Sequence, residues 1–231
     1  MTEHEVVLPG GRTTNGVVRV GDTVRRPLCM NSAFVHRLLE HLAAERCPGA
    51  PRFLGLDSAG REMLTFLPGE VPDELGAFSD EQIHRAARLL RRLHDATQES
   101  VLRDPYEVVC HGDPSPCNCV FVDGTPAAFI DFDAARPGNR RDDVGYAAWM
   151  WLDIGNAALE ARAQGQRVAD FFLAYGALDP SGAVHALLDA QTELLQRKGT
   201  PPETQRWAET CRDWVRQHFA ELSDAVKART G

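Results

Sequence analysis

Residues with metal-binding and acid–base character are concentrated in one short segment, VVCHGDPSPCNCVFVDGTPAAFIDFD, which runs from 108 to 133. Asp113 follows a His-Gly pair, Asn118 comes five residues later, and Asp131 ends an apolar run. Carboxylate and amide oxygens suit Mg²⁺, which keeps its remaining positions for water and phosphate oxygens. A carboxylate that does not bind the metal can orient or deprotonate a hydroxyl. These residue types predict phosphoryl transfer, where alignment and charge neutralisation supply most of the catalysis.

The elements that must position these side chains are short strands separated by turn residues. VVCH, NCVFV and AAFIDF are rich in β-branched and aromatic residues, and Asp123-Gly124 and Pro126 interrupt them. We expect the carboxylates of Asp113 and Asp131 to converge at the mouth of one hairpin. Asp133 lies one strand period beyond Asp131. It could help to bind the metal or face solvent, and of these two alternatives we expect that it faces solvent.

The first 71 residues predict a small antiparallel sheet with one helix. The helix is expected at 33–45, because its apolar residues recur at helical spacing. Gly, Pro and Asp residues in turns separate the other segments. The strands are expected at 5–8, 16–20, 23–27, 52–57 and 61–67.

The chain after Gly69 is predicted to be mainly helical. Ser79 and Gln82 form a capping box in front of an amphipathic helix at 81–97. Further helices are expected at 142–154, 167–178, 183–198 and, as one long final helix, 202–228.

The spacing H-x-D-x-x-x-x-N, followed by an Asp at a strand end, is that of protein kinases. In the version HGDxxxxN with IDFD, the chain resembles the aminoglycoside phosphotransferase and choline kinase-like family. REMLTFLPGE (61–70) is similar to the strand and hinge of that family, and RAARLLRRLHDAT (85–97) to the first helix of its C-lobe. The resemblance covers most of the chain.

This resemblance assigns roles to single residues. It implies that Asp113 is the catalytic base and that Asn118 and Asp131 bind Mg²⁺. It also implies that His111 braces the catalytic loop and that Asp143, in RRDDVGYAA, ties the loop in place.

The fold implied is α+β: a bilobal, protein-kinase-like fold with a shortened antiparallel-sheet N-lobe and a mostly helical C-lobe. We expect the N-lobe at 1–68, with its hinge near 64–68, and the C-lobe at 69–231, with the catalytic loop and metal site. At the hinge, the main chain of Thr65 and Leu67 would pair with a purine edge, with Leu64 beside them.

The chain departs from the family pattern at the phosphate anchor. A kinase-like N-lobe supplies a Lys on its third strand, but the first Lys here is Lys198. Arg25 and Arg26 are the residues that can take this role, and strand alternation places them on opposite faces. Arg binds phosphate bidentately but is bulkier than Lys, so the exchange is not conservative.

Two other parts of the N-lobe also differ. Glu40 and Glu45 could be the helix acid that pairs with the anchor, whereas the expected early-helix position holds His36. No GxGxxG loop is present, and PGGRTTNG (9–16) is the sole Gly-rich loop.

Composition limits the partners. The formal charge is −8 and its acidic excess lies after residue 71, which argues against nucleic acid and suits a cationic ligand. The start MTEHEVVLPGG lacks a signal-peptide pattern, and no apolar run approaches the ~18 residues of a membrane span. Six Cys without an export signal indicate reduced thiols and a cytoplasmic location. A zinc site at Cys117, Cys119 and His111 is disfavoured, because no second ligand pair has zinc-finger spacing.

Three functional hypotheses remain. The first is a phosphotransferase that uses Mg²⁺ and ATP, or another nucleoside triphosphate, to phosphorylate a hydroxyl of a small cationic molecule, aminoglycoside-like or an amino alcohol. The second is a kinase-like binding module that holds a ligand or protein without turnover, and the third is metal-assisted phosphoester hydrolysis. Retention of Asp113 favours turnover, because a binding module does not need a base. Acidic residues of the C-lobe helices could bind the amine: Asp153, Glu160, Asp170, Asp189, Glu193, Glu203, Glu209 and Asp213.

Overall fold

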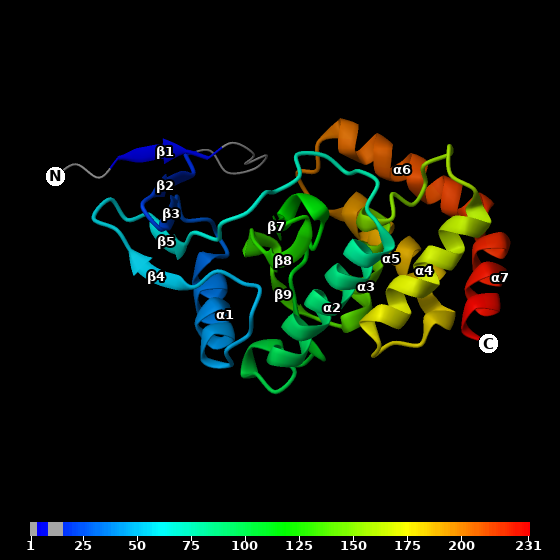
Figure 1. The fold of residues 1–231 in the computed structure, drawn as a ribbon, viewed down its shortest axis with the longest axis horizontal. Helices are drawn as coiled ribbons and strands as arrows, with labels where there is room; N and C mark the ends of the chain where they lie inside the picture. The colour runs from blue at the N-terminus through cyan, green and yellow to red at the C-terminus, as the bar shows by residue number, and fades with distance from the viewer. Residues whose placement is uncertain (1–3, 9–15) are drawn as a thin grey trace.

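The structure is a computed structural model that describes residues 4–8 and 16–231. Its α+β architecture is bilobal, with a small antiparallel sheet and one helix on the N-terminal side and a mostly helical C-terminal part (Figure 1). The expected fold class is therefore confirmed. The lobe boundary between residues 68 and 69 stays our proposal.

The N-terminal sheet contains five strands in the order β1-β2-β3-β5-β4. Tight turns join β2 to β3 and β4 to β5, and helix α1 (Ser32–Ala44) lies between β3 and β4 along the chain. The helix buries residues at a spacing of three and four, namely Val35, Leu38, Leu39 and Leu42, as the sequence pattern predicts. All but the last residue of PGGRTTNG lie outside the described residues. The strands are β1 (Glu5–Val7), β2 (Val18–Val20), β3 (Thr23–Arg26), β4 (Phe53–Leu56) and β5 (Glu62–Thr65).

Two small two-stranded sheets hold the segment 108–133 in place. One pairs β7 (Cys119–Val122) with β8 (Thr125–Phe129), which is the expected hairpin. The other pairs β6 (Val108–Cys110) with β9 (Arg136–Gly138). The sequence analysis did not predict β9, because Arg-Pro-Gly has little strand propensity. Its extended form depends on pairing with β6, a contact between segments distant in the sequence.

Six helices follow the hinge. Helix α2 begins with the predicted capping box, in which the Ser79 N–H donates to Gln82 Oε1 at 2.9 Å and the Gln82 N–H donates to Ser79 Oγ at 3.3 Å. Helix α4 begins six residues before the predicted start. The helices are α2 (Asp80–Thr97), α3 (Arg140–Trp151), α4 (Ala161–Tyr175), α5 (Ala183–Gln196), α6 (Pro202–Gln217) and α7 (Phe219–Thr230).

The prediction of one long helix over 202–228 was wrong, because the chain breaks at His218 between α6 and α7. The break lets α7 pack along α4, where Gly165 permits a close approach to the main chain of Leu222. Both helices have apolar residues at helical spacing, so periodicity alone does not reveal a one-residue interruption.

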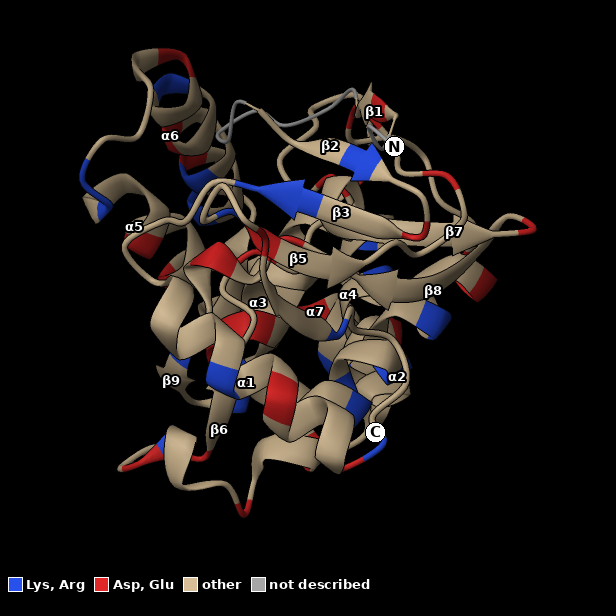
Figure 2. Cartoon of the chain, turned by 90° about the vertical axis from the view of Figure 1, so that its left-hand side faces the viewer, with Lys and Arg blue, Asp and Glu red and all other residues tan. Residues whose placement is uncertain are grey.

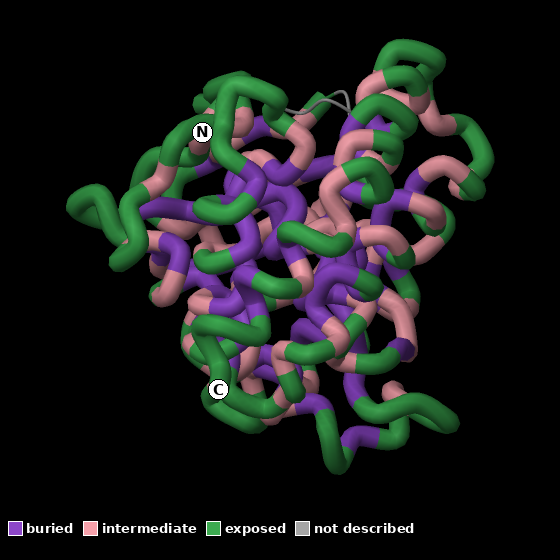
Figure 3. Tube along the Cα trace, turned by 90° about the vertical axis from the view of Figure 1, so that its right-hand side faces the viewer, coloured by how far each residue is buried: buried purple, intermediate pink, exposed green. Residues whose placement is uncertain are grey.

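The hydrophobic core extends from α1 through the helical part (Figure 3). Its largest members lie on α3 and α4 and include Trp149, Trp151, Phe171 and Phe172. Within the described ranges, each helix is too short or too polar to cross a lipid bilayer.

Candidate active site

The predicted catalytic loop, His111 to Asp113, follows β6 in a tight turn. Gly112 has φ +82°, and a Cβ there would overlap the carbonyl oxygen of Ala134, so the turn requires glycine. The main-chain N–H groups of His111 and Gly112 both donate to the carboxylate of Asp143, at 2.5 and 2.9 Å. The loop is thus held on its inner side by one buried carboxylate.

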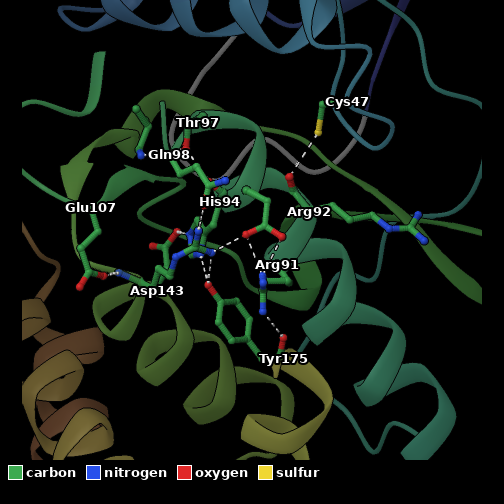
Figure 4. Close-up of polar contacts among 12 residues, drawn as sticks. Cys47, Arg91, Arg92, His94, Thr97, Gln98, Glu107, Asp143 and Tyr175 are labelled. Atoms are coloured by element: carbon green, nitrogen blue, oxygen red, sulfur yellow. Dashed lines mark hydrogen bonds and ion pairs between the residues drawn. The ribbon is translucent and has the colours of Figure 1, made fainter. Parts of the chain in front are cut away.

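Asp143 belongs to a buried polar network between α2, α3 and α4. Figure 4 shows the side chains of His94, Asp143 and Tyr175 pointing toward one another. His94 contacts Asp143 Oδ2 at 3.1 Å and the Tyr175 hydroxyl at 2.8 Å. Burial alone would raise the pKa of Asp143, but hydrogen bonds from His94 and from Gly112 lower it. The carboxylate therefore stays ionised and keeps its bonds to the loop.

His111 links the catalytic loop to the strand that delivers Asp131. Its Nε2 lies 3.0 Å from the carbonyl oxygen of Ile130, and its Nδ1 accepts the N–H of Asp113 at 3.3 Å. These partners define a neutral ring with its proton on Nε2. Burial lowers the pKa of His111, which maintains that neutral form.

The three residues predicted to act in catalysis and metal binding lie together. Asn118 donates its side-chain N–H to the main-chain carbonyl of Asp113 at 3.0 Å. The main-chain carbonyl of Asn118 accepts the N–H of Ile130 at 2.9 Å. Asp131 follows directly, in the left-handed region with φ 61° and ψ 64°. Such a conformation is uncommon outside glycine and is concentrated at functional sites.

The carboxylate of Asp113 has an unusual environment. The hydroxyl of Tyr146, on α3, faces it, and burial together with the Asp113 charge raises the pKa of Tyr146 well above its usual value. Asp113 Oδ1 is buried and has no hydrogen-bond partner among the described residues. Sequence reasoning did not find Tyr146, since a tyrosine on an apolar helix usually indicates core packing.

Arg26 reaches this site from β3, whereas Arg25 does not. The Nη1 of Arg26 lies 2.9 Å from Asp131 Oδ1, and the Nη2 of Arg26 lies 2.5 Å from Asp133 Oδ1. Arg25 lies on the other side of the strand, 3.9 Å from Asp57. Burial would lower the pKa of Arg26, but the charges of Asp133, Glu62 and Asp131 raise it, so the guanidinium remains charged.

The acid that pairs with Arg26 comes from a strand and not from the helix. Glu62 stands opposite Arg26 in the β3–β5 register, and Arg26 Nε donates to its Oε1 at 2.5 Å. Figure 2 shows the basic end of β3 close to acidic residues. The two helix acids weighed from the sequence, Glu40 and Glu45, are exposed on or next to α1. Sequence reasoning missed Glu62 because the register of the two strands was not known.

His36 occupies the helix position where an acid was expected. Its Nε2 lies 2.7 Å from Glu62 Oε2, and its ring stacks on Phe53 with centroids 3.7 Å apart. The expectation that Asp133 faces solvent was wrong, because the Asp133 carboxylate is turned to Arg26.

The predicted hinge follows β5. The N–H of Thr65 donates to the carbonyl of Arg52 at 3.0 Å, so its carbonyl is the group that a purine would have to use. Leu64 is buried and Leu67 is half-buried. Glu70 and Phe121 exchange two main-chain hydrogen bonds of 2.8 and 2.7 Å, which tie the hinge to β7. A cavity of about 380 Å³ lies beside this contact, lined by residues 68–70 and 121–124.

Several acids that were predicted to bind an amine are already paired with arginines. Ion pairs join Asp170 to Arg229, Asp189 to Arg141, Glu193 to Arg136 and Asp213 to Arg216. Glu160 instead lines a second cavity of about 220 Å³, together with Trp214, His218 and Glu221. An aromatic ring beside carboxylates suits a cation.

The residues present fit a magnesium ion. The carboxylate of Asp131 already faces one cationic group, the Arg26 guanidinium. Asn118 uses its amide N–H on Asp113, which leaves the amide oxygen as a hard ligand. Asn118 and Asp131 could therefore hold Mg²⁺.

The fold is the kinase-like fold that small-molecule phosphotransferases of known structure share. Residues 97–180 match the model of the phosphotransferase enzyme family, APH. A choline/ethanolamine kinase family protein from Mesorhizobium loti shares the fold, with 17% identity, a TM-score of 0.62 and coverage of 100% of this chain and 94% of that chain. The resemblance inferred from the sequence is confirmed.

Two further proteins are similar to this chain. An aminoglycoside phosphotransferase from Streptomyces rimosus, solved with ADP and streptomycin, has 15% identity and a TM-score of 0.56, covering 90% of each chain. The trifolitoxin immunity protein of Rhizobium leguminosarum bv. trifolii is 34% identical over 166 residues, which are 65% of this chain and 62% of that protein. The match therefore spans less than two thirds of the relative's length.

Proposed function

We propose that this chain is a Mg²⁺-dependent phosphotransferase that moves the γ-phosphate of ATP, or of another nucleoside triphosphate, to a hydroxyl of a small molecule. One observation carries the proposal: Asp113, Asn118 and Asp131 lie on one hydrogen-bonded loop and strand end, and the charged Arg26 donates a hydrogen bond to Asp131.

Asp113 is the catalytic base in this proposal. It accepts the proton of the acceptor hydroxyl as that oxygen attacks the γ-phosphorus, while the bond from phosphorus to the β,γ-bridging oxygen breaks. The Tyr146 hydroxyl faces the carboxylate, and the neutral ring of His111 fixes the loop. Both contacts keep the Asp113 carboxylate in one orientation, so fewer unproductive arrangements of base and acceptor hydroxyl occur before reaction.

Asn118 and Asp131 hold the magnesium ion in this proposal, and the bound ion supplies charge neutralisation on the phosphate oxygens. Arg26 contacts the phosphates in place of the usual Lys. The main chain at Thr65 and Leu67 faces the purine ring of the nucleotide. His111 and Asp143 support the loop.

We propose a cationic acceptor, such as an aminoglycoside-like compound or an amino alcohol. The net charge of −8 supports this class, and a structural neighbour was solved with streptomycin. Trifolitoxin belongs in the acceptor screen as well, because the curated relative is an immunity protein against it. The free thiols and the need for a nucleoside triphosphate favour a cytoplasmic location.

A binding module without turnover is the second candidate. The observation that favours it is the hydrogen bond from Arg26 to Asp131, which engages a predicted metal ligand. A binding module would hold its ligand without any need for Asp113 as a base.

Calorimetry with ATP, GTP, CTP and UTP, with and without Mg²⁺, followed by a phosphate-transfer screen over cationic alcohols, tests the proposal. Asp113→Asn should abolish transfer and leave nucleotide affinity within about two-fold, because the base does not bind the nucleotide. Asp131→Asn should abolish the Mg²⁺-dependent part of nucleotide binding. Asp123→Asn, in the exposed β7–β8 turn, is the matched control. Nucleotide binding without transfer to any acceptor would favour the binding module.

A further inference from the structure

Arg26 is surrounded by three carboxylates from two parts of the chain. Its Nε contacts Glu62 on β5, whereas Nη1 and Nη2 contact Asp131 and Asp133, which flank the turn after β8. The Glu62 side chain is 1% exposed, while those of Asp131 and Asp133 are 34% and 28% exposed. One guanidinium is thus bonded to a buried anchor on the sheet and to two accessible aspartates at the predicted metal site.

These contacts have opposite consequences for a metal ion at Asp131. A guanidinium that stays close to Asp131 repels a divalent cation there, and the repulsion is strong in a partly buried site. Glu62 draws Arg26 toward the sheet and away from Asp131. Asp133 draws it toward the predicted metal site.

Helix α1 supports both anchors. His36 contacts the second oxygen of Glu62 at 2.7 Å. Five residues earlier, Asn31 donates its amide N–H groups to the carbonyls of Asp133 and Ala135, both at 2.9 Å. The helix therefore fixes the spacing between the sheet anchor and the turn that carries Asp133.

We infer that Glu62, backed by His36, is the positioning residue that holds Arg26 for the nucleotide phosphates, and that Asp133 is an opposing anchor that reduces metal affinity at Asp131. The inference rests on the proposed function. It assigns to a strand residue the role that a helix acid was expected to have. When Asp131 binds a metal ion, Arg26 keeps its hydrogen bond to Glu62, and the terminal nitrogens of Arg26 turn to phosphate oxygens.

Direct binding of Mn²⁺, followed by electron paramagnetic resonance on the full chain without nucleotide, tests this inference. Asp133→Asn should tighten Mn²⁺ binding about ten-fold, since one charge-assisted hydrogen bond that holds Arg26 at the site is weakened. Glu62→Gln should weaken Mn²⁺ binding by a similar factor, because Arg26 then keeps only its ion pairs with Asp131 and Asp133. The double variant should return close to the wild type. Glu45→Gln, at an exposed position after α1, should change nothing.

The Mn²⁺ affinity of Asp133→Asn tests the inference even if Glu62→Gln fails to fold. Weaker Mn²⁺ binding in Asp133→Asn would make Asp133 a metal ligand and overturn the inference, as would unchanged affinity in both variants or no Mn²⁺ binding in any protein. Opposite shifts without any nucleotide binding would support the role of Glu62 and Asp133 and refute the proposed phosphotransferase. Nucleotide calorimetry on the same samples separates these results, because Glu62→Gln should also weaken ATP binding about ten-fold.

Discussion

The hydroxyl of Tyr146, on helix α3, faces the carboxylate of Asp113, so α3 supplies a polar neighbour to the predicted base. The Tyr146 ring is held edge-on against Trp149, with centroids 5.9 Å apart, and Trp149 stacks on Trp207 of α6. The orientation of the base therefore depends on aromatic packing between two helices of the C-terminal part.

Replacing Tyr146 with Phe should lower kcat about ten-fold, because the carboxylate loses one fixed partner and samples unproductive orientations. Nucleotide affinity should stay within about two-fold of the wild type. Steady-state kinetics with the acceptor found in the screen measures kcat, and Tyr106→Phe, at an exposed position, is the control. An unchanged kcat would show that Tyr146 is only a packing residue.

Gly112→Ala should destabilise the protein by about 3 kcal/mol or more, because φ +82° is unfavourable for Ala and the new methyl group overlaps the main chain at Ala134. Gly124→Ala is the matched control, since Gly124 has φ +70° but no neighbouring atom within 4 Å. It should cost about 1 kcal/mol. Urea unfolding measures both free energies, and equal losses would contradict the close approach of the loop to Ala134.

Acid should weaken the fold through His111. Burial lowers the pKa of His111 in the folded protein, whereas the unfolded chain should show the usual value of about 6.5. The unfolded state then binds more protons as pH falls below that value, so the free energy of unfolding decreases from about pH 6.5 toward the folded pKa. Urea unfolding at a series of pH values should show this slope in the wild type.

His111→Gln should flatten this pH dependence, and His84→Gln, on α2, should keep it. The contribution of His111 is fully present above pH 6.5, where both states are neutral. A slope of equal size in His111→Gln would assign the acid sensitivity to other groups.

Local patterns were sufficient to predict much of this architecture, but contacts between distant segments were not. The capping box of Ser79 and Gln82 and the spacing of Asp113, Asn118 and Asp131 are readable within a few residues. The structure confirms the capping box and shows Asn118 donating to the main-chain carbonyl of Asp113, while the roles of the three site residues stay predictions. The pairing of Arg26 with Glu62 depends on strand register, which was fixed by neither residue alone. The break at His218 lets α7 pack against α4, a contact between distant segments that leaves no local sign in the sequence.

The opposite faces of β3 give the last prediction. Arg26 points to the predicted metal site and Arg25 to Asp57. Arg26→Lys should weaken ATP binding about ten-fold, because a single ammonium group cannot keep Glu62 and also reach two phosphate oxygens in a fixed geometry. Arg25→Lys should leave the affinity within about two-fold. Calorimetry in the presence of Mg²⁺ measures the ATP affinity of both variants. Equal affinities would remove Arg26 from the nucleotide site, because the same Arg-to-Lys change would then have the same effect on either face of β3.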